Sequence, residues 1–82
     1  MNVRVLYFAG ARDVAGVAEE TCDLPASVAT VSDFARFVGE RHPALAARME
    51  SVRIARNERF AEDDERVAEG DVLALIPPVA GG

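Results

Sequence analysis

The chain is short and acidic, and its 82 residues, of which 50% are hydrophobic and 28% charged, have the balance of one folded domain. Fourteen acidic residues against nine basic ones, all arginine, give a formal charge of −5, which argues against a nucleic-acid partner. No apolar run approaches the roughly 20 residues that span a bilayer, and no signal sequence precedes the first strand pattern, so we expect a cytoplasmic protein without a membrane anchor.

The first strand pattern covers residues 2–8, which are rich in β-branched and aromatic side chains. Two-residue alternation gives one uniformly apolar face, which we predict lies in the core: Val3, Val5 and Tyr7. The other face mixes one arginine with two large apolar side chains: Arg4, Leu6 and Phe8. Residues 9–16 are bounded by glycines and predict a short helical turn, and residues 17–24 predict a second strand that Pro25 ends.

The clearest helix signal in the chain begins at Thr30. Its hydroxyl can accept a hydrogen bond from the amide of Asp33, whose carboxylate can bond back near the positive end of the helix dipole. Apolar side chains then recur at helical spacing: Val31, Phe34, Ala35 and Val38. His42-Pro43 ends this helix because proline disfavours the α conformation in the preceding residue. A short helical segment is expected over residues 44–49.

The last third of the chain predicts further strands separated by turns. Residues 52–57 indicate a strand, although Arg56 interrupts its alternation, and residues 57–59 indicate a tight turn into Phe60. The polar stretch 62–71 ends in the turn signal Gly70-Asp71, and residues 72–76 form the last strand. The order β-β-α-β-β predicts a two-layer α+β domain, in which one main helix packs on a mixed sheet of four or five strands.

Few side chains suggest catalysis or metal binding. We interpret His42 as a helix-terminus residue near the negative end of the dipole, and not as a general base. The single cysteine, Cys22, cannot form an internal disulfide, fits a reducing compartment and is expected to pack as a small hydrophobic side chain. The acidic run 62–65 lacks the spacing of a calcium loop and indicates a solvated turn, so no metal site is predicted.

The C-terminal sequence offers a different kind of chemistry. Pro77 and Pro78 stop the sheet and favour an extended exit, and the final two residues carry no Cβ atom. Such an end can pass through a narrow channel and present its carboxylate beyond it, where another protein activates it with ATP. We therefore predict a folded domain over residues 1–77 and a flexible tail over residues 78–82. The alternative is a frayed end without chemistry.

Two segments of the chain carry a family resemblance. Residues 5–16, Val-Leu-Tyr-Phe-Ala-Gly-Ala-Arg-Asp-Val-Ala-Gly, resemble the opening strand and the Phe-Ala-x-x-Arg-(Glu/Asp)-x-x-Gly turn of the ubiquitin-like β-grasp sulfur carriers. Within that family, the MoaD/ThiS carriers, they are most similar to the small subunits of molybdopterin synthase (MoaD-like). Residues 70–72 and 77–82 match the same branch, whereas residues 25–69 match in layout more than in letters.

The resemblance implies a sulfur carrier that is not catalytic alone. An adenylating enzyme (MoeB-like) would activate the carboxylate with ATP and convert it to a thiocarboxylate. The large synthase subunit (MoaE-like) would accept the tail and pass its sulfur to cyclic pyranopterin monophosphate, in molybdenum cofactor biosynthesis. Carried over, Gly82 holds the sulfur, Gly81 keeps the tail slim, and no cofactor is bound permanently. The implied partner-binding residues are Phe8, Arg12, Phe60, Ile76, Pro77, Pro78, Val79 and Ala80.

Other interpretations stay open. A carrier for thiamine-thiazole or cysteine synthesis shares the fold and the Gly-Gly end, although Pro77-Pro78 and the turn at residues 8–16 favour the molybdopterin branch. A ubiquitin-like interaction module without tail chemistry is a second alternative. Ile76 departs from the aromatic side chain that the family often has at this position. The apolar side chains of Phe8, Phe60 and Ile76 could also serve only to cap the edge of the core.

Overall fold

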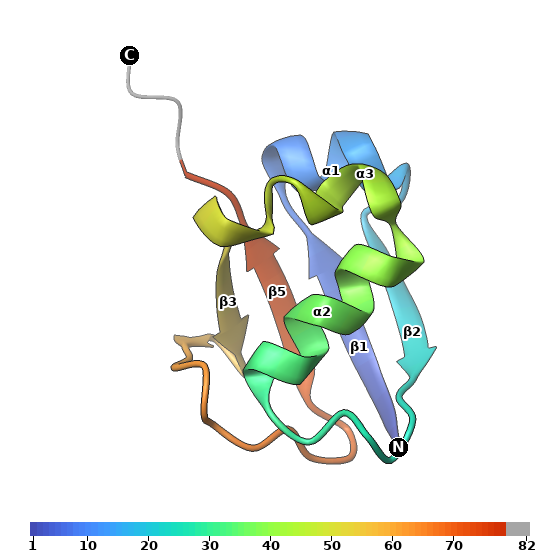
Figure 1. The fold of residues 1–82 in the computed structure, drawn as a ribbon, viewed down its shortest axis with the longest axis vertical. Helices are drawn as coiled ribbons and strands as arrows, with labels where there is room; N and C mark the ends of the chain where they lie inside the picture. The colour runs from blue at the N-terminus through green and yellow to red at the C-terminus, as the bar shows by residue number, and fades with distance from the viewer. Residues whose placement is uncertain (79–82) are drawn as a thin grey trace.

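A five-stranded mixed sheet packs against a helical layer in the computed structural model, which describes residues 1–78 (Figure 1). The strand order is β2-β1-β5-β3-β4, with β1 and β5 parallel at the centre and the other neighbours antiparallel. The strands are β1 (Asn2–Tyr7), β2 (Glu19–Asp23), β3 (Arg53–Arg56), β4 (Arg59–Phe60) and β5 (Val72–Ile76). The predicted α+β class and mixed sheet are confirmed.

The connection from β1 to β2 contains the predicted helical turn. Helix α1 (Ala9–Ala15) ends at Gly16, whose left-handed φ of 81° lets its N–H reach the carbonyl of Arg12. The second strand is shorter than the predicted 17–24. Strand β1 ends at Tyr7, whose N–H donates to the carbonyl of Ala18, so Val17 lies beyond the end of β1 and has no residue of that strand opposite it.

The main helix, α2 (Val31–Arg41), begins and ends where the sequence indicated. The amide of Asp33 donates to the Thr30 hydroxyl at 3.2 Å, and Asp33 Oδ2 accepts from the amides of Ala29 and Thr30 at 3.0 and 3.1 Å. These bonds lower the pKa of Asp33. The predicted helical segment 44–49 is instead two short pieces, α3 (Pro43–Ala46) and the 3₁₀ turn η1 (Met49–Ser51).

This split follows from the hydrogen bonding of the segment. The amides of Leu45, Arg48 and Ser51 each bond a carbonyl three residues earlier, which is 3₁₀ rather than α geometry. Leu45 of α3 is fully buried in the core and anchors the segment there.

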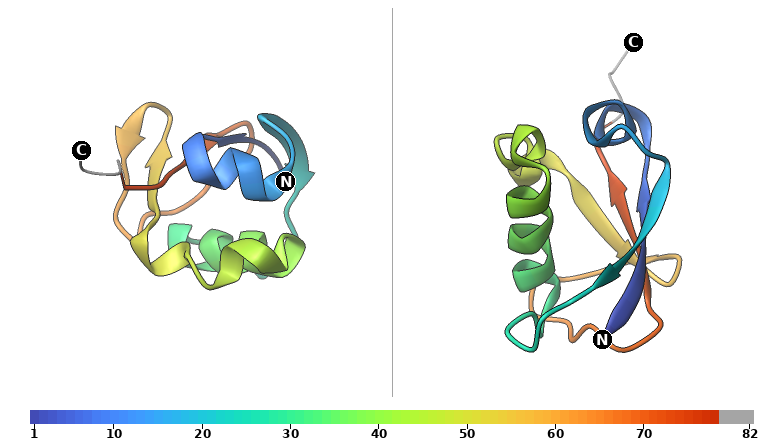
Figure 2. Two further views of the ribbon diagram at one scale, coloured as in Figure 1. Left: turned by 90° about the horizontal axis from the view of Figure 1, so that it is seen from above. Right: turned by 90° about the vertical axis from the view of Figure 1, so that its right-hand side faces the viewer.

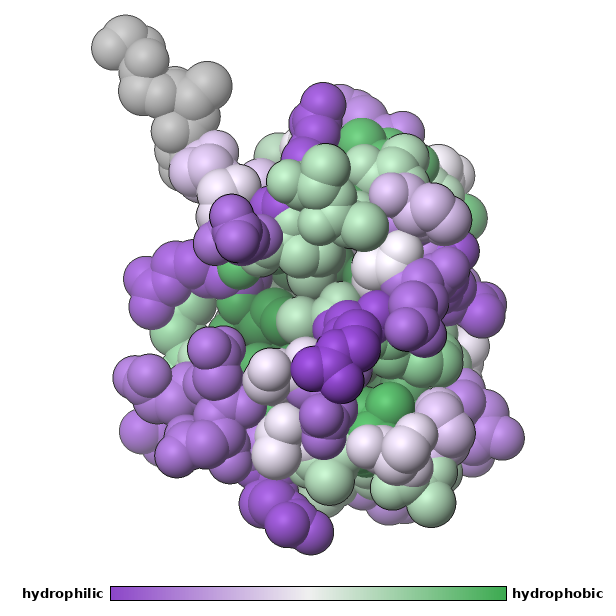
Figure 3. All heavy atoms as spheres, in the orientation of Figure 1, coloured by the Kyte–Doolittle hydropathy of each residue, from purple (hydrophilic) through white to green (hydrophobic). Residues whose placement is uncertain are grey.

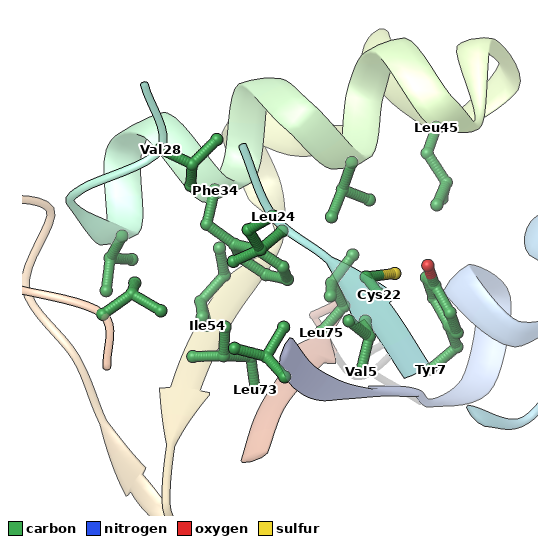
Figure 4. Packing of buried hydrophobic residues seen from close by; sticks show 14 of the residues in the cluster. Val5, Tyr7, Cys22, Leu24, Val28, Phe34, Leu45, Ile54, Leu73 and Leu75 are labelled. Atoms are coloured by element: carbon green, nitrogen blue, oxygen red, sulfur yellow. The ribbon is translucent and has the colours of Figure 1, made fainter. Parts of the chain in front are cut away.

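The hydrophobic core lies between the sheet and the helices α2 and α3 (Figure 4). The predicted inward face of β1 is confirmed, because Val3, Val5 and Tyr7 are at most 2% exposed. Leu73 and Leu75 of β5 are fully buried beside them. Figure 4 shows Phe34 of α2 pointing from the helix toward the sheet, near Leu24, Ile54 and Leu73. Burying side chains of this size stabilises the fold by roughly 1.5–3 kcal/mol each.

Asp71 ties the β3–β4 hairpin to the loop before β5. Its buried carboxylate accepts hydrogen bonds from Arg56 Nε at 2.7 Å, Asn57 Nδ2 at 3.0 Å and the Ala68 amide at 2.7 Å. Burial alone would raise the pKa of Asp71, but these bonds outweigh it and the pKa is lowered. Arg56, which interrupted the alternation of its strand, therefore points inward to reach a buried anion. The predicted tight turn is confirmed, with φ positive at Asn57 and Glu58.

The helices leave one face of the sheet uncovered. Figure 2 shows α2 and α3 on one side of the sheet and α1 at its end, beside the point where β5 finishes. The helical side, drawn in Figure 3, mixes hydrophilic and hydrophobic side chains. The N-terminus lies at the end of the sheet opposite to α1 (Figure 1). Within residues 1–78 no helix combines the length and the apolar character that spanning a membrane requires.

Candidate functional site

The uncovered side of the sheet carries an apolar hollow of about 600 Å³. We call it the outer apolar face, and its apolar lining includes Leu6, Phe8, Ala55, Phe60, Ala74 and Ile76. Strand register makes this surface continuous, because Ala74 stands opposite both Leu6 on β1 and Ala55 on β3, and Ala55 stands opposite Phe60 on β4. The alternation predicted for residues 2–8, which puts Leu6 and Phe8 on the face away from the core, is thereby confirmed.

Large side chains form the walls of this face and small ones its floor. Phe8 and Phe60 are 47% and 53% exposed, whereas Ala55 and Ala74 between them are buried. Half of each aromatic side chain therefore remains in contact with water. An exposed apolar surface of this kind marks an interaction site more often than a structural one.

The root of the C-terminal segment lies beside this face. Pro77 and Pro78 line a second hollow of about 500 Å³ together with Arg48, and Phe8 and Ile76 border both hollows. The face and the end of β5 thus form one surface.

Not every predicted partner-binding residue belongs to that surface. Arg12 is exposed on α1 and lines neither hollow, so the structure does not bring it together with the others. Val79, Ala80, Gly81 and Gly82, with all of the predicted tail beyond Pro78, lie outside the described residues. Their roles stay predictions.

A polar cluster that the sequence reasoning missed lies on the opposite side of the sheet. Glu20 of β2 accepts hydrogen bonds from Arg41 through Nε at 3.0 Å and Nη2 at 2.8 Å, and from the Tyr7 hydroxyl at 2.6 Å. His42 Nε2 lies 2.8 Å from the same carboxylate. The Arg41 pair, with help from His42 and Tyr7, lowers the pKa of Glu20 to about 2 against the opposing effect of burial.

The cluster, which we call the Glu20 clasp, links β2 to the end of α2. Both carboxylate oxygens of Glu20 are occupied by donors, which leaves this group poorly suited to accept a proton from a substrate. His42 does end the helix as predicted, but Glu20 is its side-chain partner. Burial and the Glu20 charge raise the pKa of the neighbouring Tyr7 and Cys22. Cys22 is buried and packs as a small hydrophobic side chain, as predicted.

Cation sites do not emerge from the part of the chain that the structure describes. No group of three or more His, Cys, Asp or Glu side chains in residues 1–78 converges on one point. In the acidic run 62–65, Glu65 Oε2 accepts from the amide of Glu62 at 2.6 Å and Oε1 lies 3.9 Å from Arg56 Nη1. The residues before it are exposed, so the run forms a solvated turn.

Comparison with known proteins shows the family of the chain and agrees with its fold. The sequence model of the ThiS family matches residues 5–82. The chain belongs to the ThiS family. A curated relative from Chlamydomonas reinhardtii, named molybdopterin synthase sulfur carrier subunit, is 39% identical over the full length of both chains. The human protein of that name is 31% identical, over 99% of this chain and 94% of its own. These relatives are carrier subunits rather than complete enzymes.

Solved structures show the same ubiquitin-like β-grasp fold. A putative molybdopterin converting factor subunit 1 from Pyrococcus furiosus is 36% identical, with a TM-score of 0.84 over 96% of this chain and 99% of that one. The protein SAMP1 from Haloferax volcanii is 33% identical, with a TM-score of 0.87 over the whole of both chains. A complex of subunits 1 and 2 of the molybdopterin-converting factor from Helicobacter pylori, with 22% identity and a TM-score of 0.71, shows the fold alone.

Proposed function

We propose that this chain is the sulfur carrier subunit of a molybdopterin synthase, working in the cytoplasm. The observation that carries the proposal is the family match through residue 82, joined to a relative of that name that is 39% identical from end to end. The match includes the Gly81-Gly82 end, which is the group that the chemistry requires. The reducing cytoplasm suits a chain whose single thiol, Cys22, is buried and unpaired.

The carrier chemistry takes place at the carboxylate of Gly82. An adenylating enzyme joins this carboxylate to the α-phosphorus of ATP, and pyrophosphate leaves. A hydrosulfide-level sulfur nucleophile then attacks the acyl carbon, AMP leaves, and the product is a thiocarboxylate. The sulfur passes to cyclic pyranopterin monophosphate and water restores the carboxylate, so that two carriers supply one dithiolene. Gly81 lets the end enter a narrow active site because it has no side chain.

The outer apolar face is the docking surface for the large synthase subunit in this proposal. It adjoins the end of β5, so a partner that covers Phe8, Phe60 and Ile76 also meets Pro77 and Pro78. Full burial of a large apolar side chain contributes roughly 1.5–3 kcal/mol, and these aromatics have about half of that left to gain. The complex of two converting-factor subunits from Helicobacter pylori supports a partner of this type. Arg12 is a polar contact on the neighbouring helix α1, and Val79 and Ala80 continue into the partner.

A second candidate function is protein modification. It is favoured by the 33% identity to SAMP1 and by a further structure, that of the small archaeal modifier protein 1 from Haloferax volcanii, at 32% identity. In that chemistry the adenylated Gly82 carboxyl would react with an amine of another protein, releasing AMP and forming an amide. A carrier for thiazole or cysteine synthesis would pass its sulfur into a different product. An interaction module without tail chemistry would form no product.

Intact mass spectrometry distinguishes these functions. The chain is incubated with ATP, a molybdopterin-type adenylating enzyme and sulfide, then presented to the large subunit with cyclic pyranopterin monophosphate. We expect exchange of one oxygen for sulfur, confined to the C-terminal peptide, followed by molybdopterin formation. The matched control is the variant without Gly82, which should give neither. Molybdopterin formation by that variant, or a thiocarboxylate that the large subunit cannot use, would contradict the proposal.

A further inference from the structure

The guanidinium of Arg53 lies over the ring of Phe60, one of the two exposed aromatic side chains of the outer apolar face. Its guanidinium carbon is 3.8 Å from the centre of the Phe60 ring. Arg53 stands opposite Ile76 in the register of β3 and β5, and its neighbour Ile54 points into the core, so Arg53 is on the outer side of the sheet. Stacking of this kind fixes both side chains and is worth roughly 0.5–1 kcal/mol at an exposed site.

The charge of Arg53 is not neutralised by the described part of the chain. Two other arginines of the sheet are paired, Arg4 with Glu19 and Arg56 with Asp71, whereas Arg59 of β4, like Arg53, forms no salt bridge within residues 1–78. Arg53 forms no salt bridge within residues 1–78, although Glu50, Glu62 and Asp63 line a hollow beside it. Phe60 covers one face of the guanidinium, and Arg53 as a residue is exposed to solvent.

We infer that Arg53 and Phe60 form a specificity element that selects a docking partner with a carboxylate at the edge of its apolar contact surface. The inference rests on the proposed function, in which a protein covers this face. A partner that buries Phe60 also removes water from the guanidinium stacked on it. Guanidinium has five N–H donors, accepts no hydrogen bond and stays charged, so the partner must supply acceptors.

A carboxylate is the acceptor that fits. It meets the planar guanidinium through two parallel hydrogen bonds, and the stacking on Phe60 holds that fork in place before the partner arrives. The formal charge of the chain is −5, so a partner carboxylate placed elsewhere would on average be repelled. Arg53 therefore fixes the position at which negative charge on the partner is accepted, and it discriminates against partners that present only apolar or basic groups there.

Binding of charge variants to the large synthase subunit tests this inference. Affinities are measured by calorimetry at low and high salt for Arg53→Lys, Arg53→Ala and Arg53→Glu. We expect about tenfold weaker binding for the lysine variant, which keeps the charge but loses the fork, and at least a hundredfold for the glutamate variant. The alanine variant should lose part of the salt dependence. Arg36→Glu makes the same charge change at an exposed position of α2. It is the matched control and should bind like the unchanged chain.

A reciprocal variant makes the test specific. Replacing one interface Asp or Glu of the large subunit by Arg should restore binding to Arg53→Glu and weaken binding to the unchanged chain. Equal effects of Arg53→Glu and Arg36→Glu, or equal losses for the alanine and glutamate variants at every salt concentration, would overturn the carboxylate pairing while the carrier function stands. Absence of binding by the unchanged chain would overturn both. Thermal unfolding of each variant checks that the fold is kept.

Discussion

Substitution of Glu20 by glutamine tests the clasp between β2 and the helical layer. The fold lowers the pKa of the Glu20 carboxyl group from 4.5 to about 2, and the hydrogen bonds from Arg41 are the leading cause. A shift of this size corresponds to roughly 3 kcal/mol of preferential stabilisation of the charged form. The Arg41 side chain is 45% exposed, so water screens part of that attraction. We expect Glu20→Gln to lower the free energy of unfolding by about 2 kcal/mol at pH 7.

The pH dependence of this loss identifies its cause. A depressed carboxyl pKa stabilises the fold above the unfolded-state pKa, and this stabilisation is lost as the pH falls through the folded-state pKa. The difference in free energy of unfolding between the unchanged chain and Glu20→Gln should therefore be largest above pH 4.5 and shrink toward pH 2. Urea unfolding between pH 7 and pH 3 measures the difference in free energy of unfolding. In thermal unfolding at neutral pH, the expected fall in Tm is roughly 8–16 °C. A difference below about 0.5 kcal/mol at pH 7, or one that does not shrink on acidification, would refute the charge pairing.

Three further substitutions separate binding, backbone strain and burial. Phe8→Ala should weaken binding to the large synthase subunit at least tenfold in calorimetry and leave Tm nearly unchanged; unfolding would instead assign Phe8 to the core. Ala9→Gly should raise the urea midpoint by the equivalent of up to about 1 kcal/mol, because the φ of Ala9 is 47° and its side chain is exposed; a lower midpoint would exclude strain there. Asp71→Ala should cost about 3 kcal/mol in the same assay, because Arg56 and the Ala68 amide lose their acceptor, and a loss under 1 kcal/mol would show that water replaces it.

Short-range physics made much of the fold predictable from the sequence. The inward face of β1 follows from alternation at Val3, Val5 and Tyr7, and the start of α2 follows from the capping box between Thr30 and Asp33. Each of these features depends on neighbours within a few positions. Their local preferences agree with the tertiary fold, so the sequence pattern alone predicts both features.

Features that depend on distant residues were not predictable in the same way. Glu20 finds Arg41 and His42 more than 20 residues away, and nothing local to the strand identifies them. The available signal was register, since Glu20 falls on the same face of its strand as the buried Cys22 and therefore needed a buried partner. The start of β2 was misplaced for the same reason, because the end of its neighbour β1 decides it.

The candidate site shows the same division. Alternation placed Phe8 and Ile76 on one surface, the family resemblance added Phe60, and the structure brings these three together. Arg12 was assigned to partner binding by resemblance alone, and it lies outside both hollows. The stacking of Arg53 on Phe60 was missed because it joins the two strands of a hairpin, although alternation from the buried Ile54 already put Arg53 on the outer side.

Opposite faces of the same strands carry the stability of this protein and its proposed recognition surface. Tyr7 and Phe8 are adjacent in the chain, yet Tyr7 is buried against Glu20 and Phe8 stands half exposed beside the end of β5. The inward residues form the core between the helices and the sheet, whereas Phe8 and Phe60 on the outer side remain about half exposed. Substitutions on the outer face should therefore change partner affinity with little change in the free energy of unfolding. Substitutions at Glu20 or Asp71 should do the reverse, so the two sets of variants measure recognition and folding independently.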